Sequence, residues 1–153
     1  MARTIVLRIL EHDVVAVADL LDDRAPATCE LIWDHLPVEG RLVHGMYSGP
    51  ELFIILPGFP GVPAENQTTR PLPGDIGYWH MDGGRYATQQ KDVTELVYIY
   101  DRGVEVKGPD GQTTWVNLFA QLRPAESAEF LVVSKRARTE GPWTLRVERG
   151  GVD

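Results

Sequence analysis

The sequence predicts one mostly β domain, residues 1–153, in which a closed or nearly closed β-barrel is capped by two α-helices. Three observations predict this architecture. Many short segments rich in branched and aromatic residues are separated by turns that contain Gly or Pro. Only two segments are predicted as helices. The chain has no internal repeat or linker, and its length suits a single domain with a buried core.

The chain opens with a predicted β-hairpin followed by a helix. Residues 4–10 alternate between two faces, as a half-buried strand does, and residues 14–18 return after a short turn. Pro26 suits a first helical position because its missing N–H would have no partner there. Apolar residues then follow at i, i+3, i+4 and i+7, which predicts an amphipathic helix of about three turns that ends before Pro37.

The rest of the chain contains most of the predicted strands. They are expected at residues 41–47, 52–56, 75–81, 94–100, 104–107, 113–122 and 143–147. A second helix is predicted over residues 124–138, although the segment 130–133 is also compatible with a strand. Residues 57–74 contain five prolines and fit no regular element, so we expect an ordered loop that folds over one side of the barrel.

Composition excludes several classes of protein. Hydrophobic residues make up 43% and charged residues 24%, as in globular rather than disordered chains. The net charge of −7 argues against nucleic acid and anionic membrane surfaces as partners. No apolar segment approaches the roughly 18–20 residues that span a bilayer, and Arg8 interrupts the one signal-like segment. We expect a cytoplasmic protein whose single cysteine, Cys29, is reduced and buried.

Several short motifs occur in an order that characterises one known family. They are APATCEL from Ala25, VHG from Val43, PAEN from Pro63, PGDIGY from Pro73 and VNLFAQ from Val116. In this combination the chain resembles the prokaryotic cyclophilin-like proteins of uncharacterised function, over about residues 2–149. The resemblance implies a closed eight-stranded cyclophilin-like barrel with a helix at each end.

The resemblance does not extend to prolyl isomerase activity. Isomerases of this fold stabilise the twisted amide with an arginine directly after a histidine, and Gly45 stands at that position here. A glycine offers no cation to a developing charge, and such a donor is commonly worth about 3 kcal/mol. We therefore expect no appreciable isomerase activity, and the sequence leaves open whether the chain is an enzyme.

The candidate site is a pocket for a small metabolite or short peptide on the barrel. Strands 41–47 and 75–81 combine apolar and polar side chains, and Gly45 leaves space for close approach. The predicted ligand-binding residues are His44, Tyr47, Glu65, Asn66, Trp79 and His80. In an enzyme, one of the two histidines would act as acid or base and be oriented by the glutamate, because histidine titrates near neutral pH.

Two other interpretations stay open at this point. The aromatic residues of the candidate site would also suit barrel packing, with Glu65 capping its own loop. A non-catalytic interaction or assembly module would bury the same aromatic residues in a subunit contact, and we expect a homo-oligomer, most simply a two-fold dimer.

A metal site of His44, His80 and either Glu51 or Glu65 is disfavoured because these residues lack close ligand spacing, so no metal and no cofactor are expected.

Overall fold

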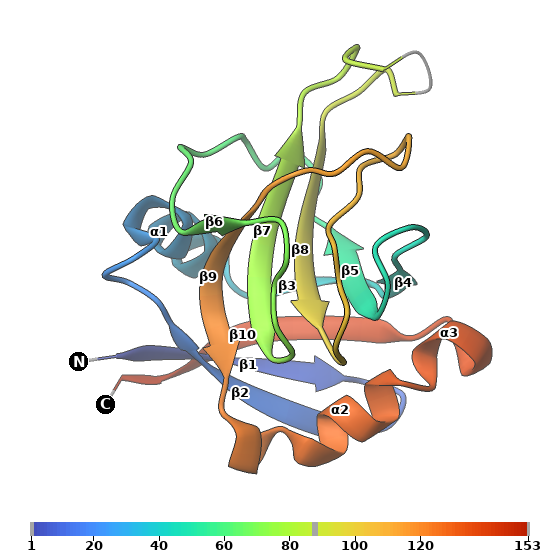
Figure 1. The fold of residues 1–153 in the computed structure, drawn as a ribbon. Helices are drawn as coiled ribbons and strands as arrows, with labels where there is room; N and C mark the ends of the chain where they lie inside the picture. The colour runs from blue at the N-terminus through green and yellow to red at the C-terminus, as the bar shows by residue number, and fades with distance from the viewer. Residues whose placement is uncertain (1, 87–88, 153) are drawn as a thin grey trace.

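A computed structural model describes residues 2–86 and 89–152, which form one antiparallel sheet of ten strands and three α-helices (Figure 1). The strands are β1 (Arg3–Ile9), β2 (Val14–Leu20), β3 (Val38–Arg41), β4 (Val43–His44), β5 (Glu51–Ile55), β6 (Gln67–Thr68), β7 (Asp75–Met81), β8 (Val93–Ile99), β9 (Val116–Leu122) and β10 (Thr144–Val152). The helices are α1 (Pro26–His35), α2 (Ala128–Ser134) and α3 (Ala137–Glu140), with a 3₁₀ turn, η1 (Pro124–Glu126), before α2. Among the described residues, no helix has both the length and the apolar character needed to cross a membrane.

The strand order corrects the prediction of a closed eight-stranded barrel. The order is β3-β10-β1-β2-β9-β7-β8-β5-β4, with β6 added to β9, and among the described residues no pairing joins β3 to β4. The expected strand 41–47 is instead two strands, because the chain changes partners at Leu42. The Leu42 N–H donates to the carbonyl of Trp143 (2.8 Å), whereas Val43 pairs with Phe53 of β5. The sheet is therefore strongly curved but not closed (Figure 1).

The connections differ most from the sequence-based expectations. The expected strand 104–107 forms an isolated bridge between Lys107 and Thr113, because its backbone also bonds to two other loops. The helix expected over 124–138 is divided among η1, α2 and α3. The loop 57–74 contains β6, which pairs with β9 close to α1 (Figure 1). By contrast, the first hairpin, α1, β5, β7 and β8 are confirmed within about two residues of their expected bounds.

The concave side of the curved sheet holds the main core. Ile5, Leu7 and Ile9 of β1 are fully buried, as the alternation of the sequence predicts. Helix α1 packs beside β9 and α2 packs against β2, so two helices cover different sides of this core (Figure 1). Cys29 of α1 is buried as expected, and burial raises the pKa of its thiol to about 12.

A second apolar cluster lies on the other face of β7, β8 and β9, and we call it the outer cluster. Its buried members are Trp79, Met81, Val97, Ile99, Val104, Val106 and Val116. The β8–β9 connection contributes two of these valines and runs back along β8 (Figure 1). Because this connection covers the outer face, polar side chains that point outward from β5 and β8 become buried too.

Candidate functional site

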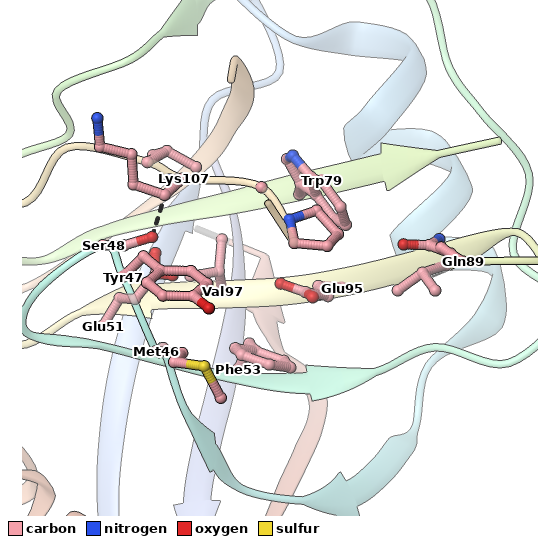
Figure 2. A pocket seen from close by; sticks show the side chains of 15 residues that line it. Met46, Tyr47, Ser48, Glu51, Phe53, Trp79, Gln89, Glu95, Val97 and Lys107 are labelled. Carbon is pink, nitrogen blue, oxygen red and sulfur yellow. Dashed lines mark hydrogen bonds between the residues drawn. The ribbon is translucent and has the colours of Figure 1, made fainter. Parts of the chain in front are cut away.

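A cleft of about 310 Å³ lies on the outer face of the sheet, between the β4–β5 and β8–β9 connections (Figure 2). Its floor consists of side chains from β5, β7 and β8, namely Glu51, Phe53, Trp79, Val93, Glu95 and Val97. Its walls are the segments 45–48 and 106–109. The cleft thus lies outside the main core, where two loops close over the sheet.

Strand alternation explains why these floor residues share one face. Phe53 pairs in register with Val97, and Trp79 pairs with Glu95. Glu51 precedes Phe53 by two residues on β5, and Glu95 precedes Val97 by two residues on the antiparallel β8. Residues two apart on a strand point to the same face. The two carboxylates therefore lie on opposite sides of the apolar Phe53–Val97 pair, both facing the cleft (Figure 2).

Glu51 is held in the cleft without a full set of hydrogen-bond partners. Its residue is 5% exposed, and Oε2 is the buried side-chain oxygen that has no partner among the described residues. Burial raises the pKa of the Glu51 carboxyl to about 6, and a hydrogen bond with Ser48 acts in the opposite direction. Gly45 leaves the space for this carboxylate, because a Cβ at position 45 would lie 2.6 Å from Glu51 Oε1.

Glu95 adds a second acid to the same cleft. Burial, with a smaller contribution from the negative charge of Glu51, raises the pKa of its carboxyl to about 8. Lys107 also lines the cleft, but its Nζ donates to Glu105 Oε1 (2.9 Å) and to Thr113 Oγ1 (3.1 Å). Figure 2 shows this side chain pointing away from both cleft acids. In the part of the chain that the structure describes, neither acid forms an ion pair.

The structure brings two of the six predicted site residues, Tyr47 and Trp79, together in the cleft. His44 lies next to the cleft wall, where its Nδ1 contacts the Gly45 carbonyl (2.8 Å) and its Nε2 contacts the Tyr100 hydroxyl (2.7 Å). These contacts hold the backbone at the start of the β4–β5 connection. We conclude that His44 stabilises the backbone of the cleft wall and does not itself line the cleft.

His80 follows Trp79 on β7 and therefore points to the other face of the strand. Its Nδ1 lies 2.7 Å from Thr94 Oγ1, and its Nε2 lies 3.0 Å from Asp82 Oδ1. Gly61 of the long loop packs on the ring, since a Cβ there would lie 3.1 Å from His80 Cδ2. The structure thus separates the two histidines that the sequence placed in one site.

Glu65 and Asn66 lie at helix α1 and strand β9 instead of beside the cleft. The Glu65 carboxylate accepts the N–H groups of Thr28 (2.9 Å) and Ala27 (3.3 Å), two free donors of the first turn of α1. Asn66 has a φ of +46° and donates from Nδ2 to the Leu118 carbonyl (2.9 Å). The expected position of these residues beside Tyr47 and Trp79 is therefore not observed. Their role in ligand binding stays a prediction.

Sequence reasoning missed the two acids of the cleft as a pair. From the sequence, Glu51 is a candidate only as a metal ligand, and Glu95 is not a candidate. The available signal was that each glutamate stands in an apolar strand, on the same face as apolar residues two positions away. That signal does not reveal burial, because burial here depends on loops that return from distant parts of the chain.

One group of possible metal ligands occurs among the described residues, and it differs from the sets considered from sequence. Ligand atoms of His80, Asp82 and Asp92 lie within 4.8 Å of one another. The His80–Asp82 contact and a hydrogen bond from Gly83 N to Asp92 Oδ1 (2.7 Å) already account for this geometry. Both aspartates are exposed, so we assign the cluster to the loop at the end of β7.

Together, the fold and the cleft define a curved antiparallel β-sheet protein with an acidic, aromatic cleft on its outer face. The chain belongs to the family described as "Protein of unknown function (DUF3830)", whose model matches residues 7–147. No curated protein sequence matches it significantly.

Among the solved structures that are similar in fold, two align with nearly the whole of this chain. One, described as McbB in complex with tryptophan, has a TM-score of 0.66 and 19% identity over 97% of this chain, which spans 45% of the McbB chain. The other is the solution structure of the hypothetical protein AF2241 from Archaeoglobus fulgidus. It has a TM-score of 0.56 and 17% identity over 97% of this chain and 95% of that one. At these identities the likeness concerns the fold.

Proposed function

We propose that the protein binds a small organic molecule in the cleft between the β4–β5 and β8–β9 connections. The observation that carries this proposal is the Glu51 carboxylate, buried on an aromatic floor with Oε2 lacking a partner among the described residues. Buried polar atoms in native proteins nearly always have a hydrogen-bond partner, so an unpartnered acceptor that faces a cleft favours a bound molecule with a hydrogen-bond donor. The cleft volume falls at the lower end of the roughly 300–1,000 Å³ typical of ligand pockets.

Two further points support this function. A protein with a similar fold is described as holding tryptophan, a small molecule with an aromatic body. Tyr47 and Trp79, predicted from the sequence as ligand-binding residues, both line the cleft. In this proposal they contact the ligand, His44 holds the cleft wall, and His80, Glu65 and Asn66 stabilise the surrounding loops. We also propose that the fold is an open relative of the cyclophilin-like barrel.

The test is calorimetric titration with four small probes: L-tryptophan, phenethylamine, phenethyl alcohol and 3-phenylpropionate. We expect at least one to bind the wild type. Phe53→Ala, on the cleft floor, should weaken that binding at least tenfold. Ile55→Ala is the matched control, because Ile55 lies on the same strand face, is 41% exposed and does not line the cleft. Absence of binding by all four probes, or equal effects of the two substitutions, would contradict the proposal.

The second candidate function is an assembly module. Met46 and Tyr47 on the cleft wall are 82% and 55% exposed, which favours contact with another surface. In that case the cleft would close in a subunit contact, and the probes would compete with self-association. Comparing probe affinity at low and high protein concentration separates the two functions.

A further inference from the structure

We propose that the ligand of the cleft is an organic ammonium: a protonated amine, held by Glu51 with Glu95, on an apolar body that packs on Phe53 and Trp79. This inference rests on the proposed function and names the chemical class of its ligand. It follows from the charge, the geometry and the hydrogen bonding of the cleft.

The charge of the cleft is unbalanced. Two acids face it, both of which are ionised above about pH 8, and the ammonium of Lys107 bonds to Glu105 and Thr113 instead. Buried charges in proteins are paired or hydrogen-bonded, because leaving one unpaired in an apolar environment costs several kcal/mol. A cationic ligand would supply the missing partner, an anionic one would add to the repulsion, and a neutral one would leave the imbalance unchanged.

The geometry of the floor suits a molecule with a charged end and an apolar body. The Phe53–Val97 pair separates the two acids, and Trp79 lies beside Glu95 in register. An aromatic face near a carboxylate favours a cation, because the ring quadrupole and the carboxylate attract it together. An apolar body therefore has a floor of rings and valine on which to lie while its charged end reaches an acid (Figure 2).

The hydrogen-bonding groups of the cleft favour a ligand that donates hydrogen bonds. Glu51 Oε2 is an acceptor without a partner among the described residues, and Ser48 Oγ already accepts the N–H of Lys107 (2.9 Å). An alkylammonium has three N–H donors and no acceptor. It would satisfy Oε2 and retain donors for a backbone carbonyl of the cleft wall, while Glu95 adds its charge from the other side of the Phe53–Val97 pair.

The proposal makes the affinity depend on pH in a defined direction. The titratable residues that line the cleft are Glu51 from β5, Glu95 from β8, Lys107 from the β8–β9 connection and Tyr47 from the β4–β5 connection, and the Lys107 side chain points away from the two acids. Ionised carboxylates attract the ammonium, so its affinity should rise as the pH passes the raised pKa values of about 6 for Glu51 and about 8 for Glu95. The alkylammonium itself stays protonated up to about pH 10.

The experiment uses three probes of similar shape and different charge. Phenethylamine should bind at least tenfold more tightly than phenethyl alcohol at pH 8, and 3-phenylpropionate should bind more weakly than both. Phenethylamine affinity should increase between pH 5 and pH 9, whereas that of the alcohol should not increase. Equal affinities for amine and alcohol would overturn the charge assignment and leave the proposed function standing. Failure of all three probes and of L-tryptophan would overturn both.

Substitutions of the two cleft acids test whether their carboxylates bind the ammonium group. Glu51→Gln should lower phenethylamine affinity at least tenfold and leave phenethyl alcohol affinity nearly unchanged. Glu129→Gln is the control, since it removes the same charge from an exposed position on α2. Glu95→Gln provides a second, independent variant if Glu51→Gln does not fold, and it should flatten the upper part of the pH profile. Equal losses for Glu51→Gln and Glu129→Gln would overturn the inference.

Discussion

Individual residues of the cleft couple folding stability to pH. Burial raises the pKa of the Glu95 carboxyl from an ordinary value of 4.5 to about 8. When a carboxyl has a higher pKa in the folded protein than in the unfolded chain, its ionisation destabilises the folded state. This destabilisation grows as pH rises from the pKa of the unfolded state to the pKa of the folded state. Without ligand, the free energy of unfolding should therefore fall between about pH 4.5 and pH 8.

Replacing this carboxyl should remove most of that loss. We expect Glu95→Gln to be more stable than wild type by roughly 1–3 kcal/mol at pH 9, with little difference at pH 4, where the wild-type carboxyl is neutral. Urea unfolding at the two pH values measures the difference. Parallel pH profiles for variant and wild type would show that Glu95 ionises freely in the folded state.

Gly45 affects both the stability of the protein and the pKa of the Glu51 carboxyl. A Cβ at this position would meet Glu51 Oε1 and Cγ at 2.6 Å, so Gly45→Ala should displace the carboxylate and cost about 1 kcal/mol or more of stability. The pKa of Glu51 should then move toward its ordinary value, because the displaced group gains solvent. Titration of the labelled Glu51 carboxyl by NMR in both proteins tests this, and an unchanged titration would show that the side chain adapts within the cleft.

The same glycine supports a separate prediction about activity. By the resemblance to cyclophilin-like proteins, Gly45 takes the position of the arginine of prolyl isomerases and provides no cation, and the nearby acids make the local charge negative. We expect no catalysed isomerisation of a proline-containing peptide in a protease-coupled assay. Turnover comparable to a cyclophilin would contradict this expectation.

At the scale of elements, the long loop supports helix α1. Glu65 accepts two N–H groups of its first turn, and Ala25, the residue before the helix, offers no side-chain cap. Glu65→Ala should cost about 1 kcal/mol and increase hydrogen exchange at residues 27–28, as removal of an N-terminal acceptor does. Glu65→Gln should retain part of the stability because its amide oxygen also accepts. Loss of phenethylamine binding in Glu65→Ala would instead favour the ligand role predicted from sequence.

Elements whose pattern is local were predictable from the sequence, and those defined by distant partners were not. The alternation in β1, the branched and aromatic residues of β8 and the proline at the start of α1 identify these elements without further information. The break at Leu42 depends on the strand that pairs with each side of it, which no local pattern encodes. The cleft acids were missed for the same reason, because their burial depends on the returning loops.

At the scale of the whole molecule, the open sheet leaves two end strands, β3 and β4. Edge strands of an open sheet and the exposed apolar side chains of Met46 and Trp115 favour self-association. The homo-oligomer predicted from the sequence stays a prediction, and light scattering at high micromolar concentration tests it. We expect twice the chain mass of 17.1 kDa. A mass equal to one chain would favour the small-molecule function over assembly.

The two apolar layers of the molecule should also differ in their effect on stability. Phe119 is fully buried in the main core, which joins strands of both halves of the sheet and two helices. Phe119→Ala should cost about 3–5 kcal/mol and lower hydrogen-exchange protection throughout the sheet. Val106 is buried in the outer cluster but belongs to the β8–β9 connection, so Val106→Ala removes less apolar surface from a more local contact.

We therefore expect Val106→Ala to cost about 1–2 kcal/mol and to loosen mainly residues 102–115 and the cleft, leaving protection in β1 and β2 unchanged. Native-state hydrogen exchange of both variants measures the pattern. The prediction is contradicted if Val106→Ala lowers protection in β1 as much as in the β8–β9 connection, because the two layers would then unfold as one unit. A local effect would mean that the cleft can open to admit a ligand without disturbing the sheet that supports it.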